Sequence, residues 1–272
     1  MGVDIQKDGA WYETTAWGRR FENWSIDMGF IEGDIEDSEF REKLKTLFNT
    51  VYEHVDGIRT MPNMVCVDSG YKTHAVYALV RECGEERVRA VKGDKESAMS
   101  QMVATPKYVD VNYAGERHNR GLKLWKVGSS MLKTQLYSWF GLKRPSEEDL
   151  ESGVKFPQGY CHFPEYGEDY FKQLTAEIKI NGQDKRGYAV EQWHKLRKDN
   201  HLLDCKAYAR AGAYMLGADR MSDSDWQSRE LLFRPAKVDS TAIKSDNESN
   251  SKRIVSSRAT NSKFKYSRGN RK

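Results

Sequence analysis

The most constraining feature of this 272-residue chain is a short apolar run, residues 64–67, that ends in a charged residue, Asp68. An uninterrupted apolar run of this length is typical of a central strand covered on both faces, as in α/β proteins. A Ser-Gly pair follows Asp68, and residues 73–83 then have helical spacing, with Val76 and Val80 on one side. We therefore expect a buried strand that ends in a carboxylate and leads through a turn into a helix.

Similar alternation extends along most of the chain. The apolar spacing predicts strands at residues 2–8, 10–18, 22–34, 87–93 and 122–130, and helices at 37–55, 131–140 and 200–216. Residues 94–121 are polar with little periodicity and predict a long loop. Residues 162–180 predict a loop that becomes a helix carrying Glu177. This order is compatible with an α/β fold, an RNase H-like mixed central sheet flanked by helices.

The charge of the chain is unevenly distributed. Of its 44 basic and 40 acidic residues, nine basic and three acidic ones lie in residues 239–272, which leaves 35 and 37 for the rest. This last stretch is rich in Ser, Asn, Lys and Arg, and it has too few apolar residues to offset the entropy of ordering. We expect one domain over residues 1–238 and a disordered basic tail over residues 239–272. The tail could bind a polyanion through counterion release, or only aid solubility.

Several classes of protein are excluded by pattern. No window approaches eighteen consecutive apolar residues, so we expect no transmembrane helix. The N-terminal residues have no apolar signal-peptide core, which predicts an intracellular chain. No CxxC pair occurs among the four cysteines, so a zinc site or a disulfide framework is not expected; they are Cys66, Cys83, Cys161 and Cys205.

Three carboxylates stand inside apolar elements. Asp4 lies in the first strand on the face opposite Val3 and Ile5, and Asp204 lies within the apolar stretch HLLDC. Ligands of open α/β sheets collect at the carboxyl ends of strands, where Asp68 is expected. Three converging carboxylates would repel one another without a cation, and Mg²⁺ prefers such oxygen ligands. We predict that they bind two Mg²⁺ or Mn²⁺ ions, which together can clamp the attacking and leaving oxygens of a phosphodiester. A turn or cap role for each aspartate remains the alternative.

Four further residues are candidates for the same site. His201 precedes Asp204 by three residues and shares its helix face, so it could be a metal ligand, a proton shuttle or only a packing residue. Lys72 and Lys92 adjoin glycine-containing turns, and Lys133 lies early in a helix. All three lysines could contact DNA phosphates; surface solvation, or for Lys133 a half-buried stem, would explain them equally well.

Other polar residues have simpler interpretations. Asp94 could cap the segment after its strand or add a metal contact. Glu177 is expected to have a structural role or to support the site indirectly, and His162 to pack against its neighbours. The strand tryptophans are expected in the core rather than as base-stacking platforms; they are Trp11, Trp17, Trp24 and Trp125.

Six segments, taken in order, carry a family resemblance: GVDIQKDGAWYETTAWG, CVDSGYKTHAVY, RVRAVKGD, LWKVGSSMLKTQLYSWF, CHFPEYGEDYFKQLTAEIKI and NHLLDCKAYA. Over about residues 1–216 the chain resembles the nuclease domain of the large terminase subunit of tailed bacteriophages, in the lambda-like branch. The resemblance implies an RNase H-like, metal-dependent endonuclease that cuts concatemeric double-stranded DNA during genome packaging in the host cytoplasm. It places the three acids of the family on Asp4, Asp68 and Asp204.

Two departures from the family pattern stand out. Where this chain has His201 the branch often has an acid, although some other terminase nucleases resemble the present arrangement, so the preferred metal stays open. The resemblance also implies an ATPase motor, a small terminase subunit and a portal protein as partners. This chain has no GxxxxGK[ST] motif, and the closest string, which starts at Gly128, lacks the second glycine. The motor half is therefore expected as a separate chain or a removed segment.

Two rival functions remain at this stage. The chain could be another RNase H-like nuclease, such as a junction resolvase, which would prefer branched over linear DNA. It could also be a non-catalytic docking or DNA-binding module of a packaging assembly, acting through its basic tail without need of metal.

Overall fold

The structure is a computed structural model that describes residues 1–54, 57–94, 101–183 and 186–233. The tail expected at residues 239–272 lies outside the described residues. No helix in the described part of the chain combines the length and apolar character needed to cross a membrane.

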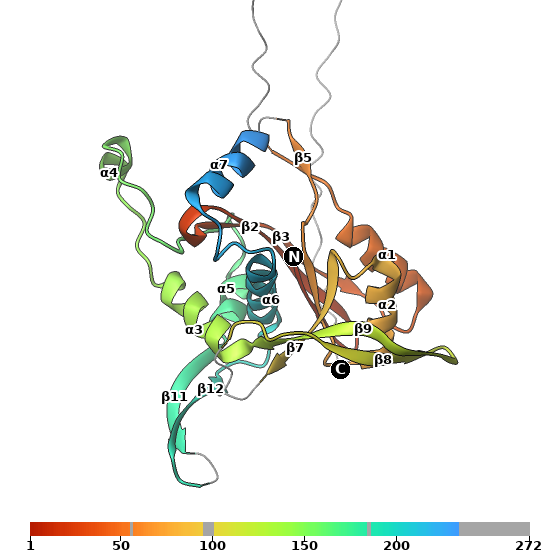
Figure 1. Ribbon diagram of the computed structural model, residues 1–272. Helices are drawn as coiled ribbons and strands as arrows, with labels where there is room; N and C mark the ends of the chain where they lie inside the picture. The colour runs from red at the N-terminus through yellow and green to blue at the C-terminus, as the bar shows by residue number, and fades with distance from the viewer. Residues whose placement is uncertain (55–56, 95–100, 184–185, 234–272) are drawn as a thin grey trace, which may run out of the picture. The chain divides into compact units, whose positions relative to one another are not determined.

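An eight-stranded mixed sheet forms the centre of the fold, in the order β10-β3-β2-β1-β6-β7-β9-β8 (Figure 1). β1, β2 and β3 form an antiparallel meander, whereas β1, β6, β7 and β9 run parallel, and β8 pairs antiparallel with β9. This arrangement confirms the expected RNase H-like mixed sheet flanked by helices. The strands are β1 (Gly2–Ile5), β2 (Gly9–Trp17), β3 (Asn23–Glu32), β6 (Val65–Asp68), β7 (Val88–Asp94), β8 (Lys107–Tyr113), β9 (Glu116–Gly128) and β10 (Cys161–His162).

Helices cover both faces of this sheet because its central strands are apolar on both sides. Val3, Ile5, Val65 and Val67 share one core with buried residues of α1 (Ser38–Phe48) and α2 (Thr73–Cys83). Cys66 and Val91 share a second core with α3 (Ser129–Phe140) and α6 (His201–Met215). Strand alternation places residues 4, 66 and 68 on the face of α6. α5 (Glu168–Leu174) packs against α6.

The smaller elements lie outside this sheet. Two hairpin pairs, β4 with β5 and β11 with β12, form separate two-stranded sheets. Their bounds, and those of the remaining helices, are β4 (Tyr52–Glu53), β5 (Arg59–Thr60), β11 (Glu177–Gln183), β12 (Ala189–Lys195), η1 (Arg19–Phe21), α4 (Glu147–Glu151) and α7 (Asp223–Leu232).

Three local predictions were wrong. The helix expected over residues 37–55 ends at Phe48, where the Asn49 N–H caps the preceding carbonyls, and residues 52–53 form β4. The loop expected over residues 94–121 contains β8 and the first part of β9, which satisfy each other's backbone groups across the hairpin. Glu177 is not helical: α5 ends at Leu174, and Glu177 begins β11, which pairs with β12 along its full length.

Candidate active site

Asp4 and Asp68 lie side by side in the sheet register. Gly2 pairs with Cys66 and Val3 with Val67 across the parallel strands β1 and β6, so the same register places Asp4 beside Asp68. Both carboxylates fall on the face of α6, because Val3, Val67 and their alternate neighbours fill the opposite core. Asp68 is also the last residue of β6, at the carboxyl edge where ligands of such sheets bind.

Helix α6 brings the third acid onto this edge. The helix packs against β1, β2 and β6 (Figure 1). It approaches β1 so closely that a Cβ added at Gly2 would lie 1.8 Å from the Cys205 carbonyl oxygen. Only glycine leaves room for this contact, which sets the position of Asp204 in the first turn of α6.

His201, the first residue of α6, contacts Asp4 directly. Its Nδ1 lies 2.7 Å from Asp4 Oδ2, while Gln6 Nε2 donates to Asp4 Oδ1 at 2.8 Å. On its other side the imidazole is stacked with the Trp11 indole, with ring centroids 5.7 Å apart and planes 6° apart. Trp11 pairs with Asp4 across β1 and β2, so neighbouring strands hold both partners of His201.

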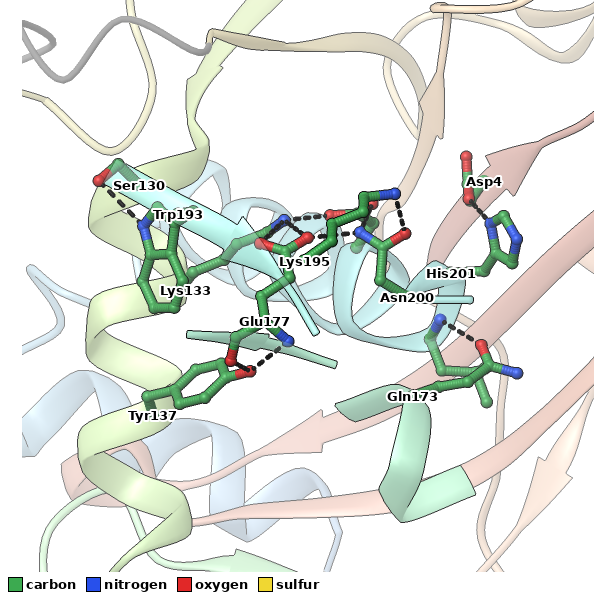
Figure 2. A network of polar contacts seen from close by, with 12 residues as sticks. Asp4, Ser130, Lys133, Tyr137, Gln173, Glu177, Trp193, Lys195, Asn200 and His201 are labelled. Carbon is green, nitrogen blue, oxygen red and sulfur yellow. Dashed lines mark hydrogen bonds and ion pairs between the residues drawn. The ribbon is translucent and has the colours of Figure 1, made fainter. Parts of the chain in front are cut away.

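A polar network surrounds Asp204, and Figure 2 shows Lys133, Glu177 and Asn200 close together in it. Lys133 Nζ lies 2.7 Å from Asp204 Oδ1 and 2.9 Å from Glu177 Oε1. The Asn200 side-chain amide donates to Asp204 Oδ2 at 3.0 Å and to Glu177 Oε1 at 2.5 Å. Lys195 donates in turn to Asn200 Oδ1 at 2.6 Å. Four residues from three other parts of the chain thus orient the carboxylate of Asp204.

The three acids interact electrostatically. Burial and the charge of Asp4, with a smaller contribution from Asp204, raise the pKa of Asp68 to about 6, although the Gly70 N–H and the Tyr208 hydroxyl favour its ionised form. Burial also raises the pKa of Asp4; the hydrogen bond from His201 opposes this shift and the charge of Asp204 adds to it. Burial is the largest cause of both shifts, and the charges of the neighbouring acids add to it.

For Lys133, burial and the neighbouring charges shift the pKa in opposite directions. Burial disfavours its ammonium form, but the charges of Asp204 and Glu177 outweigh burial and raise the pKa of Lys133. It therefore stays a cation among anions at neutral pH.

No three His, Cys, Asp or Glu side chains within the described ranges stand in a geometry ready to hold a metal ion. Protein groups also contact both oxygens of Asp4 and both oxygens of Asp204. The metal-binding roles of Asp4, Asp68, Asp204 and His201 stay predictions.

The three candidate lysines have different surroundings. Lys72 stands at the start of α2 with left-handed backbone (φ 44°) and pairs with Glu36 at 2.7 Å on the surface. Lys92 is exposed on β7, where alternation with Val88 and Ala90 places it on the face of α1 and α2. Lys133 is 8% exposed and is enclosed by the network around Asp204. Contacts of these lysines with DNA stay predictions.

Some residues of the site have little sequence signal. Asn200 directly precedes His201 and lies four residues before Asp204, a spacing that allows the observed contact, yet an asparagine there is equally typical of a helix cap. Trp11 and Lys195 had no local signal for contacts with this site. Asp94 pairs with Lys126 at 3.2 Å, and His162 bonds Glu22 at 2.8 Å and stacks on Trp24.

Comparison with known proteins identifies the family of the chain. Residues 1–226 match the family described as "Terminase large subunit gpA, endonuclease domain". The chain belongs to this family. It is also similar to the terminase large subunits of Escherichia phage lambda and Enterobacteria phage P21, with 28% identity to each over 232 and 230 residues.

This endonuclease-domain chain is shorter than those relatives. The matched residues make up 83% of the chain but only 32% and 33% of the two terminase subunits, so the chain spans about a third of their length. No solved structure matches the chain.

Proposed function

We propose that this chain is a divalent-metal-dependent endonuclease that cuts concatemeric double-stranded DNA in genome packaging by a phage terminase. The observation that carries the proposal is the convergence of Asp4, Asp68 and Asp204 on one sheet edge in a chain of the terminase endonuclease family.

The chemistry of these side chains, though not their present geometry, suits a divalent cation. All three acids offer hard oxygen ligands, which Mg²⁺ and Mn²⁺ prefer. Burial and mutual charge raise the pKa values of Asp4 and Asp68, a cost that a bound cation would relieve. When bound, two such ions supply an activated water and stabilise the charge on the leaving oxygen.

The protein side chains contribute position and proton transfer. Asp4, Asp68 and Asp204 would hold the ions, and Asn200, itself bonded to Glu177, keeps Asp204 oriented. His201 orients Asp4 through Nδ1, and the stacked Trp11 ring limits rotation of the imidazole. With the proton on Nδ1, its Nε2, which lies 4.0 Å from Asp199 Oδ1, would accept one during the reaction. Recognition of DNA would come mainly through the backbone, so the domain should show little sequence preference and strong salt dependence.

Partners follow from the relatives. By analogy with the terminase large subunits, the chain would act with an ATPase motor, a small terminase subunit and a portal protein in the host cytoplasm.

Plasmid digestion with Mg²⁺ or Mn²⁺ tests the proposal. Asp68→Asn keeps the size of the side chain but removes the charge, so cutting should fall by at least about 100-fold, equivalent to roughly 2.7 kcal/mol. Asp169→Asn, on a surface side chain of α5, is the matched control and should cut like the unmodified chain. Equal cutting by Asp68→Asn would refute the proposal. A strong preference for branched DNA would instead favour a junction resolvase, and metal-independent binding without any cutting would favour a docking module.

A further inference from the structure

Lys133 is shared between two carboxylates, only one of which belongs to the proposed metal site. Its Nζ lies 2.7 Å from Asp204 Oδ1, and 2.9 and 3.0 Å from the two oxygens of Glu177. The side chains of Lys133 and Glu177 are 10% and 4% exposed, so water screens little of their interaction. Figure 2 shows Lys133 and Glu177 pointing toward each other beside Asn200.

Glu177 has contacts of its own that hold it in place. The Glu177 backbone carbonyl accepts a hydrogen bond from Tyr137 Oη at 2.6 Å, and the Glu177 backbone N–H donates one to Tyr137 Oη at 3.1 Å. The Asn200 amide bonds its Oε1. Glu177 is therefore a fixed counter-charge, while the long, flexible side chain of Lys133 is the part of the pair that can move.

The bond from Lys133 occupies an oxygen that a metal ion would need. Asp204 Oδ2 already accepts from Asn200, and Oδ1 accepts from Lys133. An ammonium 2.7 Å from a ligand oxygen would repel a divalent cation at that oxygen, because little water screens the charge of Lys133. Lys133 can leave Asp204 without becoming an unpaired buried charge, because both oxygens of Glu177 remain within reach.

We propose that Lys133 is an internal counter-ion that holds Asp204 while divalent metal is absent and shifts onto Glu177 when the metal binds. Lys133 and Glu177 are thus positioning residues with opposite effects: Lys133 competes with the metal, and Glu177 draws Lys133 away from Asp204. This inference rests on the proposed function, in which Asp204 holds metal.

The two residues should change metal affinity in opposite directions. Lys133→Gln removes the competing charge, so Mn²⁺ should bind about threefold to tenfold more tightly, as expected for coupling between neighbouring charges. Glu177→Gln leaves Lys133 with Asp204 as its only anionic partner in the network, so Mn²⁺ should bind more weakly by a similar factor.

Mn²⁺ binding to the full chain without DNA, followed by electron paramagnetic resonance of free Mn²⁺ and by calorimetry, measures this directly. Lys43→Gln is the matched control, because Lys43 pairs with Glu39 on the exposed side of α1, outside this network; its affinity should stay within twofold of the parent.

Folding of the variants is checked by thermal melting. Should Lys133→Gln fail to fold, the double variant Lys133→Gln/Glu177→Gln buries no unpaired charge and gives a second test. It should bind Mn²⁺ more tightly than Glu177→Gln alone.

The outcomes separate this inference from the proposed function. Weaker Mn²⁺ binding in both single variants would mean that Lys133 and Glu177 only keep Asp204 in position. Unchanged Mn²⁺ affinity in both variants would mean that the pair has no role in metal binding. Either result overturns the inference while Asp68-dependent cutting stands. No Mn²⁺ binding by the parent chain, together with no cutting, would overturn both.

Discussion

The ion pair between Lys206 and Glu13 yields the sharpest stability prediction. Lys206 lies in α6, two residues after Asp204, and its Nζ is 2.9 Å from Glu13 Oε1 in β2. Both side chains are 0% exposed, so no solvent screens either charge. Lys206→Met would leave Glu13 buried without a counter-charge, which typically costs about 3–5 kcal/mol.

The surroundings of Glu13 place the expected loss near the middle of this range. Ser25 and Tyr170 still donate to Glu13 Oε1 at 3.0 Å each, which compensates part of the loss. Its Oε2 has no hydrogen-bond partner among the described residues, so nothing there adds further compensation. We expect a loss of about 4 kcal/mol in the free energy of unfolding. For a domain of this size that corresponds to a decrease of about 8–16 °C in Tm.

Urea and thermal unfolding at pH 7, followed by circular dichroism, provide the assay. The double variant Glu13→Gln/Lys206→Met removes both charges together and should unfold within about 1 kcal/mol of the parent. A loss below about 1 kcal/mol in Lys206→Met, or a double variant as unstable as the single one, would refute this reasoning about the buried pair.

Two further predictions concern the sheet. Gly2→Ala should lower the free energy of unfolding by about 3 kcal/mol or more and abolish cutting, because the added Cβ would meet the α6 backbone at Cys205 and Ala209. Gly141→Ala is the control, because no atom lies within 4 Å of its added Cβ. Equal melting temperatures of the two variants would contradict the predicted clash at Gly2. Burial raises the pKa of Asp27 above its unfolded value of 3.8, although hydrogen bonds from Tyr52 and the Met28 N–H oppose this shift. The contribution of Asp27 to folding stability is therefore present below pH 3.8 and is lost as the pH rises through its folded pKa. Asp27→Asn should therefore gain stability relative to the parent between pH 4 and pH 7 in urea unfolding, and parallel pH profiles would contradict this.

Much of the central sheet could be predicted because its signals are local. The apolar run before Asp68, the alternation around Asp4 and the apolar stretch around Asp204 each indicate an element without knowledge of its neighbours. These signals also placed the three acids on elements whose ends meet in an α/β fold. β8, the first part of β9 and the hairpin β11–β12 were missed because these strands are largely exposed, so hydrogen bonds to the neighbouring strand of each hairpin, rather than an apolar pattern, form them.

The amino-acid sequence by itself determined which strands and helices carry Asp4, Asp68, His201 and Asp204, since apolar periodicity acts within a few residues. Only the tertiary structure decided the partners of these side chains. Lys133, whose contact with DNA stays a prediction, lies between Asp204 and Glu177, residues 71 and 44 positions away along the chain. The packing of α3 against α6 brings Lys133 to Asp204, and no local pattern encodes the distance between two residues that far apart.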